Sequence, residues 1–459
     1  MTAIPSPAAF PTQQPRGLGL LFFTEMWERF SYYGMRALLV LYLIDSATGG
    51  FGWTQEKASR FYGWYTGLVY LTPILGGWLA DRYLGTARSL VIGGIVIALG
   101  HFTMAADTRV SFFLGLVLII IGTGFFKANV STLVGQLYGE HDPRRDAGFT
   151  IFYIGINAGA FLGPLVCGWL AANPRYGWSW GFGAAGVGMA LGVTCFLLLR
   201  KKYLGDIGMV PMAHGQTDAG RKAAAEPLTK DERDRVLAIV MVVFFVAFFW
   251  LAFEQAGSSL NVFAQQKTQR AVGGWLGSVL PKGEIPAAWF QSVNAFFILT
   301  LAPLFALLWK RMGARQPSTA VKMTWGLFFL GLGFVVIALG ALLAGATGLA
   351  NPGFLVTLYF LHTCGELLVS PVGLSFVTKV APVKIASMMM GVWFLSNFSA
   401  NLVGGYIAGT VQKVARGEVF TLLGGQADFF LIFVITSFAA CGLLLLLTPT
   451  LNRLIHGRG

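Results

Sequence analysis

The chain has 459 residues, of which 55% are hydrophobic and only 12% are charged, and its formal net charge is +13. A soluble protein of this length would carry about 25% charged residues and would divide into domains joined by polar linkers. Nearly every long segment here is apolar, which excludes a soluble globular protein and indicates that lipid surrounds most of the surface. The basic residues form no clustered face, so a nucleic-acid-binding protein is not supported.

Apolar segments long enough to cross a bilayer recur along the whole chain. We expect an all-α membrane protein with twelve transmembrane helices in two six-helix bundles. The predicted helices cover residues 18–46, 55–80, 89–106, 110–137, 147–171, 177–199, 236–264, 288–309, 319–345, 352–379, 385–411 and 428–450. They give an N-terminal tail (1–17), an N-terminal bundle (18–199), a polar linker (200–235), a C-terminal bundle (236–450) and a C-terminal tail (451–459).

Lys and Arg are distributed unevenly between the two sides of this arrangement. With the N-terminus in the cytoplasm, the cytoplasmic segments hold more than twice as many Lys and Arg residues as the opposite segments. This bias predicts a multi-pass protein of the plasma (inner) membrane with both termini cytoplasmic.

A small set of ionisable residues falls inside the predicted spans: Glu25, Glu28, Arg29, Arg36, Lys127, Glu254 and Glu366. Each would cost roughly 2.5–3.5 kcal/mol at a helix centre facing lipid. We therefore expect these side chains to face the bundle interior, where they can pair or line a wet cavity. Such residues are typical of transport pathways.

Several of them share one face of the first predicted helix. Glu25, Arg29, Tyr32 and Arg36 follow one another at intervals of four, three and four residues, and Glu28 can reach the same stripe. A carboxylate one turn before a guanidinium can pair with it and lower the cost of burying both charges. The cluster could be a structural ion-pair network that locks the helix in the bundle, or it could serve function, and the sequence leaves both open.

The two halves carry opposite charges at corresponding depths. If the halves are parallel repeats, Arg36 in the first helix corresponds to Glu254 in the seventh. In the same way, Lys127 in the fourth helix corresponds to Glu366 in the tenth, so each pair can attract across a central cleft. A cleft with a basic and an acidic wall suits a zwitterion, and a carboxylate whose ion pair breaks can take up a proton.

Other polar and aromatic residues interrupt the apolar runs near these charges. They are candidate pocket walls: Tyr33, Tyr70, Asn157, Trp250, Asn294, Trp393 and Ser396. We interpret His101 and His362 as structural histidines. The four cysteines lie in apolar runs without metal-ligand spacing, and no phosphate-binding loop, zinc-protease or nucleophile-elbow motif occurs, so we expect no metal, no organic cofactor and no enzyme.

Residues 25–34 read E-M-W-E-R-F-S-Y-Y-G. This segment resembles the E-x-x-E-R-F-x-Y-Y-G signature of the proton-dependent oligopeptide transporters, a branch of the major facilitator superfamily. Residues 76–85 (GGWLADRYLG), 152–159 (FYIGINAG), 366–371 (ELLVSP) and 393–396 (WFLS) are similar to further motifs of that family. The resemblance therefore extends over nearly the whole chain.

The resemblance implies the major facilitator fold and uptake of di- and tripeptides by proton symport, with the proton as coupling ion. By the family pattern, the proton-coupling residues would be Glu25, Glu28, Arg29 and Glu254. Arg36 and Lys127 would hold the peptide carboxylate, and Glu366 the amino terminus. The remaining substrate-binding residues would be Tyr32, Tyr33, Tyr70, Asn157, Asn294, Trp250, Trp393 and Ser396.

The sequence departs from the family pattern in three places. The segment 200–235 is too short and too charged to supply the two extra helices of many prokaryotic members, so we expect twelve helices. Gly63 stands where animal members have a histidine in the second helix. Residues 250–258 read W-L-A-F-E-Q-A-G-S, with one residue more than the family's W-A-x-x-E-Q-G-S, which leaves the local register after Gln255 open.

Two other functions remain compatible with these residues. The solute could be another small organic or inorganic anion, or the protein could be a sensor that binds peptide without moving it. The partners that we expect are di- and tripeptides, protons and the lipid bilayer, with no nucleic acid, and we expect the monomer to be the functional unit.

Overall fold

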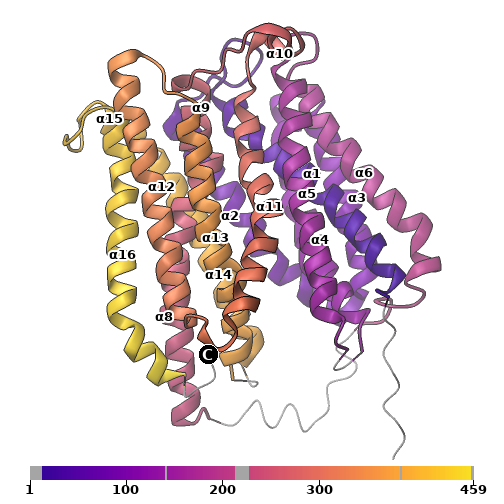
Figure 1. The fold of residues 1–459 in the computed structure, drawn as a ribbon. Coiled ribbons are helices and arrows are strands. Elements are labelled where there is room, and N and C mark those ends of the chain that lie inside the picture. Colours follow the sequence, from indigo (N-terminus) through magenta and orange to yellow (C-terminus); the bar gives the residue numbers. More distant parts are fainter. Residues whose placement is uncertain (1–12, 140–141, 212–226, 383–384, 456–459) are drawn as a thin grey trace, which may run out of the picture.

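The computed structural model describes residues 13–139, 142–211, 227–382 and 385–455 (Figure 1). Within these ranges the chain is helical apart from short connections and two isolated β-bridges. The long helices of the first half are α1 (Arg16–Ile44), α2 (Gln55–Leu79), α3 (Thr86–Met104), α4 (Arg109–Gln136), α5 (Arg145–Ala172) and α6 (Trp178–Tyr203). Those of the second half are α8 (Lys230–Phe253) with its continuation α9 (Ser259–Lys267), α11 (Phe290–Met312), α12 (Thr319–Thr347), α13 (Gly353–Val380), α14 (Ala386–Ala408) and α16 (Gln426–Leu454). The predicted all-α architecture of twelve long helices in two six-helix halves is confirmed for the described residues.

The helices have the composition of membrane spans. Among the described residues, nine helices are long and apolar enough to cross a membrane. Helices α1, α2 and α14 are not among the nine, but they pack against other helices: α1 against α5 and α6, and α2 against α4 of its own half and α14 of the other half. Large apolar side chains such as Leu198 and Leu446 point outward, 75% and 77% exposed, as expected where lipid replaces water.

The molecule has two ends, which we call the linker side and the α10 side. The linker side is where α1 begins and where the chain passes from α6 to α8, at the bottom of Figure 1. The α10 side, at the top of Figure 1, carries the short helix α10 (Gly274–Val279). Helices α6 and α8 both extend into the segment predicted as linker, of which residues 212–226 lie outside the described residues.

The seventh predicted span, 236–264, is confirmed as one span over Lys230–Lys267, which a short 3₁₀ turn interrupts. Helix α8 begins earlier, at Lys230, because Thr229 and Glu232 form a capping box. It ends at Phe253, and a 3₁₀ turn, η3 (Glu254–Gly257), precedes α9. The interruption falls where the sequence carries its extra residue. A side chain at Gly257 would collide with the Tyr62 hydroxyl and would lie 3.2 Å from Arg36 Nε, so the glycine makes room first for Tyr62 and then for the guanidinium that Tyr62 contacts.

Asp45 organises the loop after α1 on the α10 side. Its carboxylate accepts hydrogen bonds from Thr48 N (3.0 Å) and Oγ1 (2.7 Å), from Gly50 N (3.1 Å), and from Trp178 Nε1 (3.2 Å) at the start of α6. Burial raises the pKa of Asp45, but the hydrogen bonds from Thr48, Gly50 and Ala47 outweigh that effect and bring the pKa below its ordinary value.

Candidate functional site

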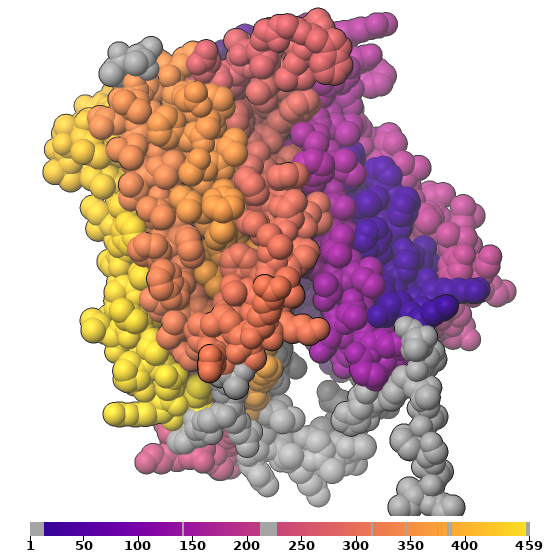
Figure 2. Space-filling view, viewed as in Figure 1, coloured from indigo at the N-terminus to yellow at the C-terminus, as the bar shows by residue number. Residues whose placement is uncertain are grey.

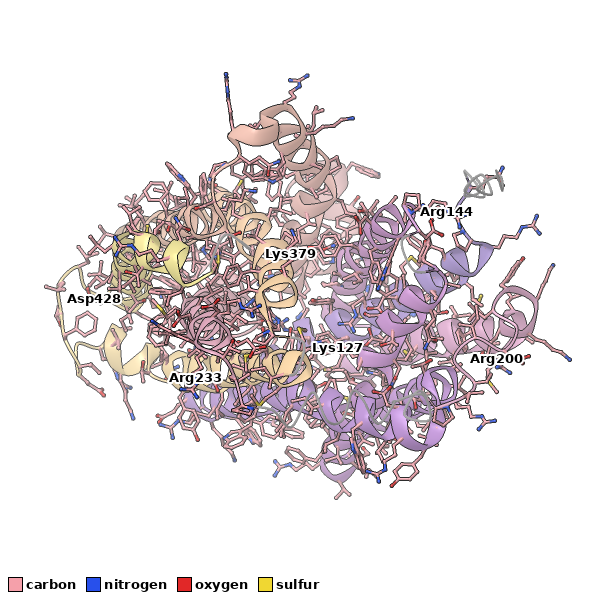
Figure 3. The ribbon with its side chains drawn as sticks, turned by 90° about the horizontal axis from the view of Figure 1, so that it is seen from below. Lys127, Arg144, Arg200, Arg233, Lys379 and Asp428 are labelled. Carbon is pink, nitrogen blue, oxygen red and sulfur yellow. The ribbon has the colours of Figure 1, made fainter. Side chains whose placement is uncertain are left out.

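A cavity of about 360 Å³ lies between the two halves, with walls from α1, α2, α4 and α5 on one side and from α8, η3, α11 and α13 on the other. Most of the residues singled out in the sequence line it: Glu25, Arg29, Tyr33, Arg36, Tyr70, Lys127, Asn157, Trp250, Glu254, Asn294 and Glu366. Its size suits a small solute. Figure 3, which views the molecule from the linker side, shows Lys127 near the boundary between the halves.

Four of the singled-out residues do not line this cavity. Glu28 and Tyr32 are buried on α1 beside it, 1% and 3% exposed. Trp393 packs in the apolar core of the second half, and Ser396 Oγ donates a hydrogen bond to Trp393 O at 2.7 Å. The structure therefore does not bring α14's two candidate pocket residues to the cavity in this conformation.

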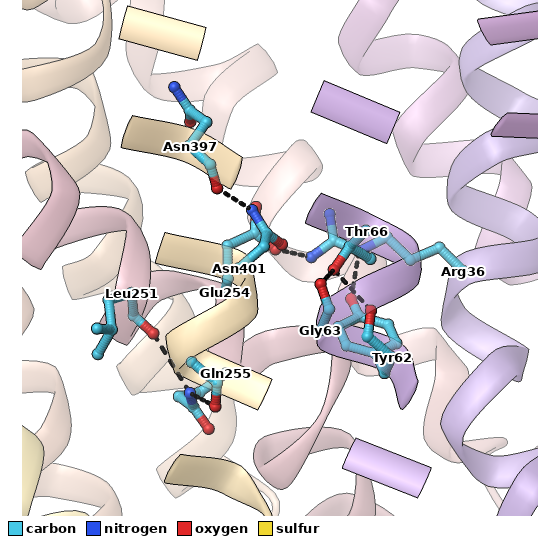
Figure 4. A network of polar contacts seen from close by, with 10 residues as sticks. Arg36, Tyr62, Gly63, Thr66, Leu251, Glu254, Gln255, Asn397 and Asn401 are labelled. Atoms are coloured by element: carbon cyan, nitrogen blue, oxygen red, sulfur yellow. Dashed lines mark hydrogen bonds and ion pairs between the residues drawn. The ribbon is translucent and has the colours of Figure 1, made fainter. Parts of the chain in front are cut away.

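An ion pair joins the two halves at the cavity wall. The guanidinium of Arg36 on α1 pairs with the carboxylate of Glu254 on η3, and its Nε donates to Tyr62 Oη on α2 at 2.5 Å (Figure 4). The side chains of Arg36 and Glu254 are only 7% and 6% exposed. Because a buried charge needs a partner, each of these two residues fixes the other.

A second charged group lies on α1, deeper toward the linker side. Arg29 Nε lies 2.8 Å from Glu25 Oε1 and 2.5 Å from Glu28 Oε2. Both are close contacts between opposite charges. They do not have the geometry of hydrogen bonds, because Arg29 Nε has no hydrogen-bond acceptor among the described residues. The ammonium of Lys127 on α4 lies 3.7 Å from the centre of the Tyr70 ring. Lys127 is therefore held by a cation–π contact on this wall.

On the opposite wall, Glu366 differs from Glu254 because its described hydrogen-bond partner is neutral. Glu366 Oε2 on α13 accepts a hydrogen bond from Asn294 Nδ2 at 2.9 Å, and the same amide nitrogen lies 2.9 Å from Thr363 Oγ1. No ion pair joins Glu366 to Lys127 in the part of the chain that the structure describes. Of the two expected attractions across the cleft, the one between Arg36 and Glu254 is made and the one between Lys127 and Glu366 is not.

The cavity has further polar lining residues that the sequence reasoning missed. Tyr153 precedes Asn157 by one turn, and Gln291 precedes Asn294 by three residues, so the helical period could have identified both. Tyr62 could have been found in the same way, because it shares the α2 face of Tyr70 at a spacing of two turns. The Gln291 Nε2 atom is buried without a partner.

His362 also lies at the cavity wall, although its ring is 1% exposed. The ring centre is 4.9 Å from that of Phe334 and 6.0 Å from that of Phe253. This apolar setting agrees with the interpretation of a structural histidine.

The cavity is closed toward the α10 side by two seams between the halves. In the first, α2 and α14 meet so closely that a side chain at Gly63 would lie 2.8 Å from Asn401 O and 2.9 Å from Gly405 Cα. In the second, the Trp289 indole donates to Leu165 O at 2.9 Å, next to the packing of α5 on α11. Toward the linker side the two halves separate, and Figure 2 shows the surface hollowed there. The cavity is thus sealed from one end of the molecule.

Comparison with known proteins supplies a family for this arrangement. The sequence model described as the POT family matches residues 87–205 and 214–423. The chain is 35% identical to the peptide transporter YePEPT of Yersinia enterocolitica, covering 96% of this chain and 95% of the relative. It is 34% identical to a di-/tripeptide transporter of Lactococcus lactis, covering 90% and 92%. An uncharacterized transporter of Bacillus subtilis, YclF, is 38% identical over 96% of this chain and 95% of its own length.

Solved structures agree in fold over nearly the whole chain. The crystal structure of a peptide transporter POT in complex with sulfate superposes with a TM-score of 0.85 at 37% identity, covering 97% of this chain and 96% of that one. A POT family transporter in complex with 5-aminolevulinic acid gives a TM-score of 0.83 at 30% identity, covering 95% and 97%.

Proposed function

This chain belongs to the POT family, and we propose that it is a proton-coupled symporter that imports di- and tripeptides by alternating access between its two halves. The observation that carries this proposal is the cavity between the halves, whose walls hold opposite charges and whose closed end is tied by a buried ion pair. A solute that carries both charges can satisfy both walls at once.

The walls suggest how a peptide lies in the cavity. We place its carboxylate toward Arg36 and Lys127 in the first half, because guanidinium and ammonium groups form strong charge-assisted hydrogen bonds to carboxylates. Its ammonium group lies toward Glu366, whose orientation is set by Asn294 at 2.9 Å. Tyr33, Tyr70, Asn157 and Trp250 then surround the side chains, and the unpartnered Gln291 amide offers a donor to a backbone carbonyl.

Proton coupling follows from competition for Arg36. Glu254 pairs with this guanidinium, so an arriving peptide carboxylate competes with it for Arg36. A displaced Glu254 has lost the positive partner that keeps it ionised in a buried site, and it takes up a proton. Proton and peptide therefore bind together, and the proton is the coupling ion of this proposal, with no other cofactor.

The cluster of Glu25, Glu28 and Arg29 supplies a second set of titratable groups on the linker-side part of α1. Two buried carboxylates share one guanidinium there. Such a site is easily protonated when a further cation, here Lys127, turns away toward a peptide. We propose that these residues pass the proton onward and release it on the linker side.

The closed α10 side and the parted linker side correspond to a carrier that releases its solute toward the linker side. We propose that this side is the cytoplasm and that the protein lies in the plasma (inner) membrane, supported by the excess of Lys and Arg in the segments on that side. The cavity is built within one chain, which supports a functional monomer.

The test is uptake of labelled dialanine into proteoliposomes under an inward proton gradient. We expect accumulation that a protonophore abolishes and that unlabelled di- and tripeptides compete for. Uptake that the protonophore leaves unchanged would refute coupling. Competition by small anions but not by dipeptides would identify an anion carrier, and binding without net flux would identify a sensor.

A further inference from the structure

A second polar cavity lies inside the C-terminal half, on the linker side and apart from the central one. It measures about 270 Å³ and lies where the ends of α11 and α13 meet the start of α12. Lys322 on α12 and Lys379 on α13 both line it, and Lys379 is labelled in Figure 3. The proposed transport cycle assigns no role to this pocket.

The pocket is basic, and no carboxylate of the described residues neutralises it. Lys322 and Lys379 are close enough to repel each other. In the part of the chain that the structure describes, no carboxylate lines the pocket and neither lysine forms an ion pair. Lys322 Nζ donates to the neutral Gln316 Oε1 at 2.9 Å and lies 4.3 Å from the centre of the Trp309 ring. Two ammonium groups on one cavity favour an anion between them.

Apolar side chains complete the pocket. Leu367 and Phe376 line it and are 6% and 5% exposed. Trp309 lies one turn before the linker-side end of α11, the depth at which indole rings mark the boundary between lipid and water. A basic group above an apolar base matches an amphiphile with a negative head, whereas a free inorganic anion would make no use of the apolar part.

We propose that this pocket binds the phosphate headgroup of an anionic phospholipid, with the first carbons of its acyl chain against Leu367 and Phe376. Basic pockets between transmembrane helices on the side that faces the cytoplasm are the usual places for such headgroups. Leu367 directly follows Glu366 and points about 100° away from it around α13, so lipid and substrate lie against different faces of this helix. The lipid fixes the linker-side end of the helix that carries the acidic wall.

Native mass spectrometry of the full-length protein measures this binding directly, with phosphatidylglycerol and phosphatidylcholine as probes. We expect the wild type to retain phosphatidylglycerol in preference to phosphatidylcholine. The double variant Lys322→Ala/Lys379→Ala should lose about 30-fold in affinity for phosphatidylglycerol, since each lysine contributes ~1 kcal/mol. The matched control Lys310→Ala/Arg311→Ala removes the same charge from the exposed last turn of α11, outside the pocket, and should bind as the wild type does.

Two further variants separate a defined site from general charge attraction and from misfolding. Val372→Trp fills the pocket without changing charge and should also abolish binding, while Lys322→Arg/Lys379→Arg should retain it. Equal binding by the wild type and both pocket variants, or an equal loss in the control, would overturn the proposal. A thermal shift with inorganic phosphate, present in the wild type and absent in the alanine variant without any lipid effect, would overturn the lipid assignment in favour of a free anion.

Discussion

The buried pair between Arg36 and Glu254 predicts what happens when its acid is neutralised. Glu254→Gln leaves the Arg36 guanidinium 7% exposed with only Tyr62 as a hydrogen-bonding neighbour. Removing one partner of a buried pair costs about 3–5 kcal/mol, of which the glutamine oxygen recovers about 1 kcal/mol. Because the pair exists only while the α10 side is closed, the cost of about 3 kcal/mol falls on that state. The equilibrium should shift about 150-fold toward opening at the α10 side.

Two measurements test this prediction. Spin labels on the α10-side ends of α2 and α14 should report a longer distance in Glu254→Gln than in the wild type. Gradient-driven uptake should be abolished, while counterflow exchange should survive, because a bound peptide carboxylate takes the place of Glu254 at Arg36 and restores closure. The control is Glu284→Gln. Its carboxylate is 42% exposed where it pairs with Arg270, whose side chain is 12% exposed, so water screens the pair from one side and the expected effect is about 1 kcal/mol. Unchanged label distances together with surviving gradient-driven uptake would refute the reasoning.

Three further predictions follow from other contacts. Glu366→Gln should raise KM for dipeptides about 10- to 100-fold, because one charged hydrogen bond to the peptide is lost. KM for an N-acetylated dipeptide should not change, and an equal rise for both substrates would contradict a site for the amino terminus. Gly63→Val should oppose closure of α2 on α14 by about 1–3 kcal/mol and should slow uptake. The control Gly77→Ala should transport normally, because its added carbon would lie 3.5 Å from the nearest atom. Asp45→Asn should lower the melting temperature at pH 7, and the difference should shrink as the pH falls below about 4. A carboxyl with a lowered pKa stabilises the fold above its ordinary pKa and loses this contribution as the pH falls through the lowered one. A difference that stays constant as the pH falls would contradict this prediction.

The number of helices and their grouping could be predicted because the bilayer dictates span length and because charges are expensive within it. The interruption of the seventh helix could not be predicted from apolar periodicity. At the interruption Gly257 lies against Tyr62 and Arg36 of the other half, residues that are far away along the chain. The extra residue after Gln255 indicated where the helix departs from the family pattern, but it did not predict a 3₁₀ turn there.

The site was predictable to the extent that helical spacing determines which residues share a face. Glu25, Arg29 and Arg36 reach the cavity as their spacing indicates, and Glu254 meets the base at the corresponding depth of the other half. Trp393 and Ser396 do not reach the cavity, because the rotation of α14 about its axis is set by its packing against α2 and α8. Packing of that kind leaves no periodic signal in the sequence.

The two repeat-related pairs together indicate how the ends of the cavity alternate. Arg36 lies nearer the α10-side end of α1, and Lys127 lies nearer the linker-side end of α4, which runs in the opposite direction. In this conformation the pair on the closed side is made, and Lys127 and Glu366 on the open side remain apart. If the halves are parallel repeats, the converse state would close Lys127 onto Glu366 and release Arg36 from Glu254. A peptide whose two ends contact these residues can replace either ion pair. The bound peptide therefore lowers the free-energy cost of passing from one state to the other, and without it that cost remains.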